Sequence, residues 1–295
     1  MINFTPIPIL FKIGNFTVYS FGLFVALGGL IAILLSLKEA KKRNIEQEKV
    51  LGILLFTMVG ALIGARILYI IQNPSQFNFF WDYINLSEGG LNGAGTLIGG
   101  TLFAFLYIKI SKMSMGEFGK LMDVIAPYLV LAFAIGRIGC FLRGCCFGLP
   151  TNLPWGIVYP AESLAVQAGL NTAVHPTQLY HSILDFIIFF ILLKLGNKKH
   201  NLQKNNVKSK YRFFSIGGSI FLLFLMLYSS ERFIVDFFRY HPASEYVSIL
   251  TVTQLIYAAI FIAAFVMSEM LAKTTCSIRS ISDHPKNKRG GALFF

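Results

Sequence analysis

The stretch LMDVIAPYLVLAFAIGRIGCFLRGCCFG (121–148) decides the fold, because its apolar part is long enough to cross a bilayer as a helix. About 20 apolar residues span the hydrocarbon core, and the window 121–141 has that length. The same window contains Arg137, and an arginine within a membrane costs roughly 2.5–3.5 kcal/mol on insertion scales. Such a residue usually faces a polar cavity or an anion. We therefore expect a membrane helix that carries part of a functional site.

The whole chain has the composition of an integral membrane protein. Of its 295 residues, 55% are hydrophobic and 14% are charged, whereas a soluble domain carries about 25% charged residues. The mean hydropathy is +0.63. Seven windows qualify as spans, of which the third and fifth are short: about 17–37, 50–71, 94–110, 121–141, 181–196, 214–238 and 248–271. We predict an all-α membrane protein with about seven transmembrane helices.

The distribution of charge predicts an orientation. Connections rich in Lys and Arg, such as 38–49 and 194–212, alternate with the connection 72–93, which contains neither residue. Since cytoplasmic loops carry an excess of Lys and Arg, the N-terminus is predicted outside and the C-terminus in the cytoplasm. The net charge of +12 follows this topology instead of forming one basic patch. Nucleic acid is therefore not an expected partner.

The chain is expected to form one integral membrane domain, residues 1–272, followed by a basic cytoplasmic tail, 273–295, that is disordered. The polar, basic segment 197–211 is expected to be a flexible loop. The glycine-rich run 88–100 has two interpretations. Its small residues favour close packing of helices, or they permit close approach of the backbone to a ligand.

Polar residues gather at the predicted outer ends of separate spans. Arg66 and Arg137 lie toward the outer ends of the second and fourth spans, and His175 and Gln178 precede the fifth. Polar groups from different helices thus share one depth. This arrangement is what a binding site for a lipid headgroup in the outer leaflet requires.

The sixth span ends in the charged stretch SERFIVDFFR. Its spacing of i, i+4 and i+7 predicts one helix face that carries Arg232, Asp236 and Arg239. One interpretation is a structural network of ion pairs, such as Arg232 with Asp236 and Arg137 with Glu231 or a carbonyl. However, arginine outnumbers carboxylate at this depth, and guanidinium groups suit the geometry of phosphate. We predict an anionic phospholipid as the ligand.

Three of the four cysteines lie in the stretch CFLRGCC, near the outer end of the fourth span. Small buried thiols that fill space between helices are one interpretation. A disulfide from Cys140 to Cys145 or Cys146 is another, because the outer side is oxidising. A site for zinc or a soft metal with Cys140, Cys145 and His175 is a third, and a thiolate nucleophile beside Arg143 is a fourth. The sequence leaves these alternatives open.

Motifs in collinear order resemble those of the prolipoprotein diacylglyceryl transferase family. The matching stretches are YSFG (19–22), GARILY (64–69), GGLNGAGTLIGG (89–100), DVIAP (123–127), GRIGCF (136–141) with Gly144 and Gly148, HPTQLY (175–180) and RFIVDFFR (232–239). They extend over about residues 9–272, and together they are specific. The chain resembles a divergent member of this family.

The resemblance implies an enzyme of the bacterial plasma (inner) membrane. Such an enzyme transfers the diacylglyceryl group of phosphatidylglycerol to the lipobox cysteine thiol in a prolipoprotein signal peptide and releases glycerol 1-phosphate. It implies no cofactor and no metal. By matched position, Arg137 and Arg232 hold phosphate and Asp236 orients an arginine. His175 is the fourth implied catalytic residue, since a histidine titrates near neutral pH.

We also expect a set of substrate-binding residues around the headgroup and the rim of the site. This set consists of Arg66, Tyr69, Arg143, Gly148, Gln178, Tyr180 and Arg239.

The chain departs from the family pattern at six positions. Phe21 replaces a tyrosine, Ala94 a histidine, Cys140 and Arg143 two asparagines, and Cys145 and His181 two glutamates. The residues implied to bind phosphate are retained, whereas those implied to handle the proton are replaced. Two other functions therefore stay open. One is a catalytically silent membrane protein that binds phospholipid, and the other is a transferase with the same donor and a different acceptor.

Overall fold

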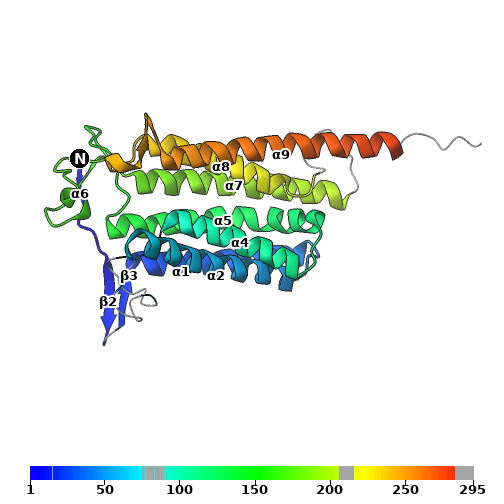
Figure 1. Ribbon diagram of the computed structural model, residues 1–295, viewed down its shortest axis with the longest axis horizontal. Coiled ribbons are helices and arrows are strands. Elements are labelled where there is room, and N and C mark those ends of the chain that lie inside the picture. The colour runs from blue at the N-terminus through cyan, green and yellow to red at the C-terminus, as the bar shows by residue number, and fades with distance from the viewer. Residues whose placement is uncertain are drawn as a thin grey trace, which may run out of the picture.

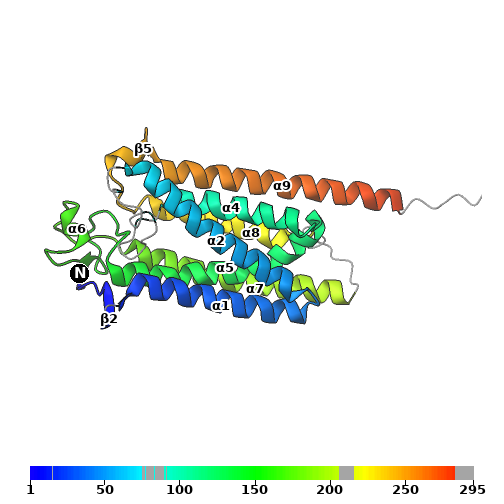
Figure 2. The same ribbon diagram turned by 60° about the horizontal axis from the view of Figure 1, so that its bottom comes forward.

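The protein is a bundle of long helices that lie side by side (Figures 1 and 2). The computed structural model describes residues 1–14, 16–74, 77, 83, 90, 92–205 and 216–282. Its long helices are α1 (Ser20–Lys42), α2 (Gln47–Gln72), α4 (Gly93–Ile110), α5 (Met115–Arg143), α7 (Thr177–Lys204), α8 (Ser219–Asp236) and α9 (Val252–Ser282). Within lipid, every backbone polar group has to be paired inside its own segment, and a helix does this.

Each of the seven predicted windows contains one of these helices, which confirms the prediction of an all-α membrane protein. In the described part of the chain, six of them are long and apolar enough to cross a membrane. The seventh, α8, has 18 residues and includes Glu231, Arg232 and Asp236. The count of seven spans and the placement of the two termini stay predictions.

Short strands and connections cover one end of the bundle, which we call the loop end (Figure 1). It is formed by the first residues of α1, α4, α7 and α9 and the last residues of α2, α5 and α8. The short elements pair as β1 (Ile2–Asn3) with β4 (Ile157–Val158), β2 (Ile9–Ile13) with β3 (Phe16–Tyr19), and β5 (Tyr246–Val247) with β6 (Leu250–Thr251). Helix α6 (Leu164–Gln167) and a 3-10 helix (Ala243–Glu245) complete this end.

Glycines bring α2 and α4 into backbone contact. A Cβ atom on Gly64 would lie 2.3 Å from the Gly95 carbonyl oxygen, and one on Gly99 would lie 2.1 Å from that of Gly60. Small residues let membrane helices approach this closely, and packing then replaces the hydrophobic effect as the attraction between them. The packing interpretation of the run 88–100 is therefore confirmed for Gly95 and Gly99.

Helix α5 is the centre of the bundle. Half of its most apolar window is buried, a larger share than in the other five candidate spans. Glycines again set the approach of its neighbour α1, because a Cβ on Gly28 would lie 2.8 Å from the Ala132 carbonyl oxygen. This central position carries Arg137 and Cys140 to the loop end of the bundle.

At the opposite end, Asp123 of α5 caps the first turn of α8. Its carboxylate accepts hydrogen bonds from the backbone N–H groups of Gly218, Ile220 and Phe221 at 2.8–3.0 Å. These N–H groups have no partner within their own helix. Lys199 of α7 neutralises the carboxylate, with Nζ 2.7 Å from Asp123 Oδ2. One acidic residue thus joins three helices.

This contact explains why one prediction about a loop is wrong. The segment 197–211 was expected to be a flexible loop, but α7 continues as a helix to Lys204, so the expectation is wrong for 197–204, and residues 206–211 lie outside the described residues. Lys199 is only 4% exposed and also donates hydrogen bonds to Ser219 Oγ and the Ile216 carbonyl. A basic residue in a polar segment therefore anchors the helix. Helix α9 likewise continues past residue 272 to Ser282, and the rest of the predicted tail lies outside the described residues.

Substituting Lys199 tests the contribution of this contact to stability. Lys199→Ala leaves the Asp123 carboxylate buried without its cation, and removal of one partner from a buried pair costs about 3–5 kcal/mol. We expect the free energy of unfolding, measured by denaturing-detergent titration in mixed micelles, to fall by that amount. Lys194→Ala changes an exposed lysine of the same helix and serves as the control. Equal unfolding midpoints for the two variants would contradict the prediction.

Candidate active site

A chain of polar contacts joins α7 and α8 inside the loop end of the bundle. His181 Nδ1 donates a hydrogen bond to the Glu231 carboxylate, and Arg232 Nη1 donates to His181 Nε2 at 3.3 Å. The two partners require the neutral His181 tautomer that carries its proton on Nδ1. His181 and Glu231 are 1% and 5% exposed. His181 therefore fixes the direction of the Arg232 side chain.

Arg137 of α5 belongs to the same group. Its charge acts on His181, Asp185 and Glu231, which lie on α7 and α8. Arg232 completes the group and lies over the rings of two tyrosines, with its Cζ 5.9 Å from the Tyr228 centroid and 5.3 Å from that of Tyr257. Aromatic faces attract a guanidinium ion without neutralising it.

The arginines of this group have no carboxylate within ion-pair distance. Three acidic side chains at the loop end pair with histidines instead, Glu231 with His181 and both Asp236 and Glu245 with His241. Ion pairs of Lys and Arg occur at the opposite end, with Glu39, Glu46, Glu117 and Asp123. Among the described residues, four arginines of the loop end lack any carboxylate oxygen within 4.0 Å: Arg137, Arg143, Arg232 and Arg239.

The count of charges made from the sequence is wrong in one respect. Asp185, which that count omitted, is buried on α7, so the surplus of arginine over carboxylate at this depth is smaller by one than was counted. The site is distinguished by how its charges pair, because the four arginines named above form no ion pairs with carboxylates among the described residues. A single ionisable residue in an apolar span is a signal of function, and this rule would have found Asp185.

Asp236 does not orient an arginine, contrary to the sequence-based expectation. Its carboxylate accepts hydrogen bonds from His241 Nε2 at 2.8 Å and from Thr251 Oγ1 at 2.5 Å. Helix α8 ends at Asp236, so the predicted face with Arg232 and Arg239 at i and i+7 does not form. Asp236 instead joins the end of α8 to the connection that leads into α9.

His175, Tyr180 and Trp155 form a small network at the start of α7. The Tyr180 hydroxyl lies 3.1 Å from His175 Nδ1 and accepts a hydrogen bond from Trp155 Nε1 at 2.8 Å. Burial lowers the pKa of His175 below its ordinary value, which favours the neutral ring at neutral pH. Gly148 packs beneath this network, since a Cβ there would lie 2.5 Å from His175 Cβ and from the Phe238 carbonyl oxygen. Because Gly148 has no side chain, its backbone can lie against those of His175 and Phe238.

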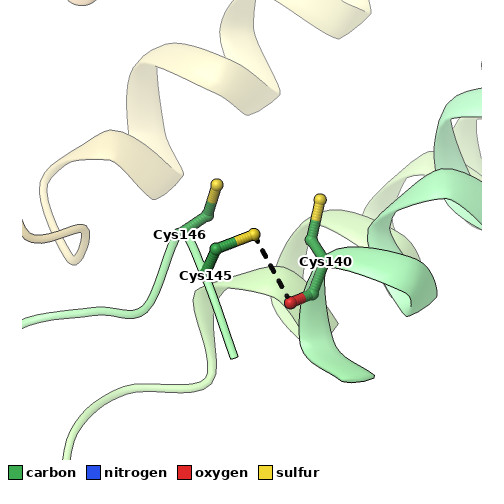
Figure 3. Close-up of side chains that lie close together, drawn as sticks. All are labelled: Cys140, Cys145 and Cys146. Carbon is green, nitrogen blue, oxygen red and sulfur yellow. Dashed lines mark hydrogen bonds between the residues drawn. The ribbon is translucent and has the colours of Figure 1, made fainter. Parts of the chain in front are cut away.

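Three thiols lie together where α5 ends (Figure 3). The Sγ atoms of Cys140, Cys145 and Cys146 are within 4.8 Å of one another, and all three are free thiols. Hydrogen bonds from Cys140 and Cys145 lower the pKa of Cys146 well below its usual value, and the charges of Arg239 and Arg137 act in the same direction. The same sulfur contacts raise the pKa of Cys145.

Side chains of α7 hold the loop that carries these thiols. Gln178 Nε2 donates to the Cys145 carbonyl and Thr177 Oγ1 to the Cys146 carbonyl, each at 2.7 Å. Both donors are fully buried. Gln178 therefore positions the cysteine loop, a contact that the sequence did not reveal.

The remaining predicted residues lie on α2 and α5. Arg66 of α2 donates to the carbonyls of Tyr83 and Gly90, each at 3.1 Å, and its Cζ lies 6.0 Å from the Tyr69 ring. At the end of α5, Arg143 Cζ lies 5.8 Å from the ring of Phe21, one of the departures from the family pattern.

Most of the buried polar atoms that lack a partner are at this site. In the described part of the chain, seven buried side-chain atoms have no hydrogen-bond partner, and five of them belong to residues of the loop end: Gln178 Oε1, Asp185 Oδ1, Glu231 Oε2, Arg232 Nε and Arg239 Nε. A buried polar atom without a partner costs about 1–3 kcal/mol. Two donors and three acceptors are thus available to a ligand that has both acceptor and donor groups.

His241 makes stability depend on pH. Burial alone would lower its pKa, but hydrogen bonds to Asp236 and Glu245 raise it above the ordinary 6.5. Because the folded protein binds this proton more tightly, the stabilisation is complete below pH 6.5 and is lost as the pH rises through the raised value. We expect the unfolding temperature in detergent to fall above pH 6.5, and His241→Gln to remove this part of the decline. His200→Gln, at the opposite end, should keep it. A His241→Gln profile identical to that of the parent would contradict this assignment.

Comparison with known proteins gives one consistent answer. A sequence profile described as prolipoprotein diacylglyceryl transferase matches residues 8–270. A phosphatidylglycerol–prolipoprotein diacylglyceryl transferase of Clostridium tetani (strain Massachusetts / E88) is 32% identical, over 84% of this chain and 91% of its own. A second such protein, from Clostridium perfringens (strain 13 / Type A), is 35% identical over 88% of this chain and 93% of its own length. One from Thermotoga maritima is 30% identical over 87% of this chain and 82% of its own length. The chain belongs to the prolipoprotein diacylglyceryl transferase family.

Proposed function

We propose that this protein transfers the diacylglyceryl group of phosphatidylglycerol to the lipobox cysteine thiol of prolipoproteins. The reaction is a step in the biosynthesis of bacterial lipoproteins, and it takes place in the plasma membrane. The names of the relatives support the donor and the class of acceptor. The spans and the charge pattern support a multi-pass protein whose loop end faces outward.

One observation carries the proposal, namely that Arg137, Arg232 and Arg239 have no carboxylate oxygen within 4.0 Å among the described residues. A guanidinium that is buried without an anion is costly, and a phosphodiester would supply the missing charge. Arg137 and Arg232 are our candidates for this contact, with Arg239 near the cysteine loop as a third. Planar guanidinium groups donate two parallel hydrogen bonds to phosphate oxygens.

The other unpaired atoms suit the rest of the headgroup. Phosphatidylglycerol carries hydroxyl groups on its terminal glycerol, and each hydroxyl can donate a hydrogen bond. The free oxygen atoms of Gln178, Asp185 and Glu231 are acceptors at the same end of the bundle. A ligand with a phosphate and hydroxyl groups thus matches both kinds of unpaired atom.

In the reaction, the acceptor sulfur attacks the glyceryl carbon that bears the phosphate ester. The thiol proton passes to water, a C–S bond forms, the C–O bond breaks, and glycerol 1-phosphate leaves with one more negative charge than the diester had. Arginines that are already in position before the reaction begins stabilise this developing charge. In a site that excludes water, such stabilisation is worth several kcal/mol. His181 is a positioning residue, because it acts through Arg232.

The other predicted residues have supporting roles in this proposal. His175 and Tyr180 order the rim, and Gln178 holds the cysteine loop while offering its oxygen to the headgroup. Arg66 and Tyr69 lie toward the end of α2, where they can contact the donor lipid as it enters. Asp236 supports the connection between α8 and α9. The silent lipid-binding alternative is not favoured by the comparisons.

The arginines give the test. In cells depleted of their own transferase, we expect the parent protein to add the diacylglyceryl mass to a reporter prolipoprotein. Arg137→Ala and Arg232→Ala should each lower the rate of transfer at least about 100-fold, the usual effect of removing one donor to a developing anion. Arg279→Ala, in the predicted tail, should transfer at the parental rate.

Detergent-purified variants should unfold at the parental temperature, which separates lost chemistry from lost folding. Parental transfer by both alanine variants would refute the assignment of the phosphate contact. Phospholipid that copurifies with the parent protein while the reporter gains no mass would support the silent alternative instead.

A further inference from the structure

The cluster of Cys140, Cys145 and Cys146 is not used by the proposed function. The three sulfur atoms lie within 4.8 Å of one another, and the Cys145 side chain points toward Cys140 (Figure 3). Three sulfur ligands that share a Zn²⁺ ion at about 2.3 Å lie about 3.8 Å apart at tetrahedral angles. Binding of Zn²⁺ would therefore shorten the distances between these sulfur atoms by about 1 Å at most.

The backbone presents these thiols as a preformed set. Gly144 ends α5 in the left-handed conformation with φ of 76°, and Cys146 has φ of 60°, which is uncommon for a residue with a side chain. This turn returns the chain toward the last turn of the helix, where Cys140 lies. Thr177 and Gln178 then fix the carbonyls of the two loop cysteines. A binding site that is held by buried contacts loses little freedom when a ligand enters.

The surrounding charges suit an anionic metal–thiolate centre. Three thiolates around Zn²⁺ carry a net charge of −1, and the positive charges of Arg137 and Arg239 act on the Cys146 sulfur. Thiolate ligands select soft or borderline ions such as Zn²⁺ over Mg²⁺ and Ca²⁺. The zinc site considered from the sequence used His175 as its third ligand, but the structure groups Cys146 with the other two thiols.

We propose that Cys140, Cys145 and Cys146 bind one Zn²⁺ ion and leave its fourth position open for the acceptor thiol. Catalytic zinc sites have three protein ligands and an open position, whereas structural sites have four. The first part of this inference is independent of the proposed function, and the second part rests on it. Cys140 and Cys145 occupy two of the positions at which the chain departs from its family, so the zinc ion would act where proton-handling residues are missing.

The step balances without a general base. Coordination deprotonates a thiol, so the acceptor cysteine binds zinc as a thiolate and releases its proton to water. The zinc-bound sulfur attacks the glyceryl carbon of the donor lipid, and the bond from carbon to the phosphate oxygen breaks. The thioether product is a weaker ligand than a thiolate and leaves the metal. No group is oxidised or reduced.

Cobalt is a suitable probe, because Co²⁺ substitutes for Zn²⁺ and absorbs visible light when thiolates bind it. The full-length protein, purified in detergent with a non-thiol reductant and freed of metal, is titrated with Co²⁺. We expect one equivalent to bind with tetrahedral thiolate absorption. Cys140→Ser, Cys145→Ser and Cys146→Ser should each weaken binding more than about 100-fold, since loss even of a residue behind the ligands costs 10–100-fold. Cys276→Ser is the matched control and should bind as the parent does.

A synthetic signal peptide with one cysteine tests the open position. It should shift the cobalt spectrum, whereas the same peptide with serine should not. An unchanged spectrum with the cysteine peptide would overturn the acceptor part of the inference. Absence of cobalt binding, or a disulfide within the cluster in membranes isolated without reductant, would overturn the site itself.

The two proposals fail in different ways. Transfer to the reporter by metal-free protein would overturn the acceptor part of the zinc inference and leave the proposed function intact. Stoichiometric cobalt binding without any transfer would support the metal site and count against the function. Transfer that is lost on removal of metal and restored by Zn²⁺ supports both.

Discussion

Guanidinium groups that are held inside the bundle without a carboxylate are the constraint around which the loop end is organised. An unpaired charge in a medium of low dielectric constant is costly, so the fold must gain something from keeping it. Here two acidic neighbours of the arginines are bound by histidines, Glu231 by His181 and Asp236 by His241. The histidines thus occupy two carboxylates that could otherwise pair with the arginines. In our proposal the partner of the arginines is an anion from outside the chain, which accounts for the gathering of polar side chains from α5, α7 and α8 at one end of the bundle.

The opposite end of the bundle shows the same chemistry used for stability. There Asp123 accepts three backbone hydrogen bonds and pairs with Lys199, so a buried charge is satisfied at every oxygen. The contrast between the two ends argues against a purely structural origin for the unpaired arginines. Proteins keep strained or unsatisfied groups mainly at functional sites. At the end that holds Asp123 and Lys199, the charged groups hold the helices together. The loop end carries the buried polar groups that lack a partner.

The sequence predicted the helices and the identity of the charged residues better than their pairing. The seven apolar windows follow from hydropathy alone, because lipid demands long apolar helices. Partners across helices depend on rotation and depth, which periodicity does not determine. Asp236 was therefore assigned to an arginine although it binds His241 and Thr251, and Asp185 was missed because it lies alone in an apolar run. The contacts of Gln178 with the cysteine loop join residues 33 positions apart, and no local pattern predicts them.

Three of the departures that the resemblance implies bear on the handling of a proton. Phe21, Ala94 and Cys145 stand where a phenol, an imidazole and a carboxylate are implied. In our proposal these three groups are absent, while Arg137 and Arg232 receive phosphate. A reaction that keeps its leaving-group stabilisation but loses its bases needs a nucleophile that is already deprotonated. At the proposed zinc site the acceptor thiol would be that nucleophile at neutral pH, because coordination to the ion replaces its proton. The cysteines and the missing bases would then be two aspects of one change in the way the acceptor sulfur is activated.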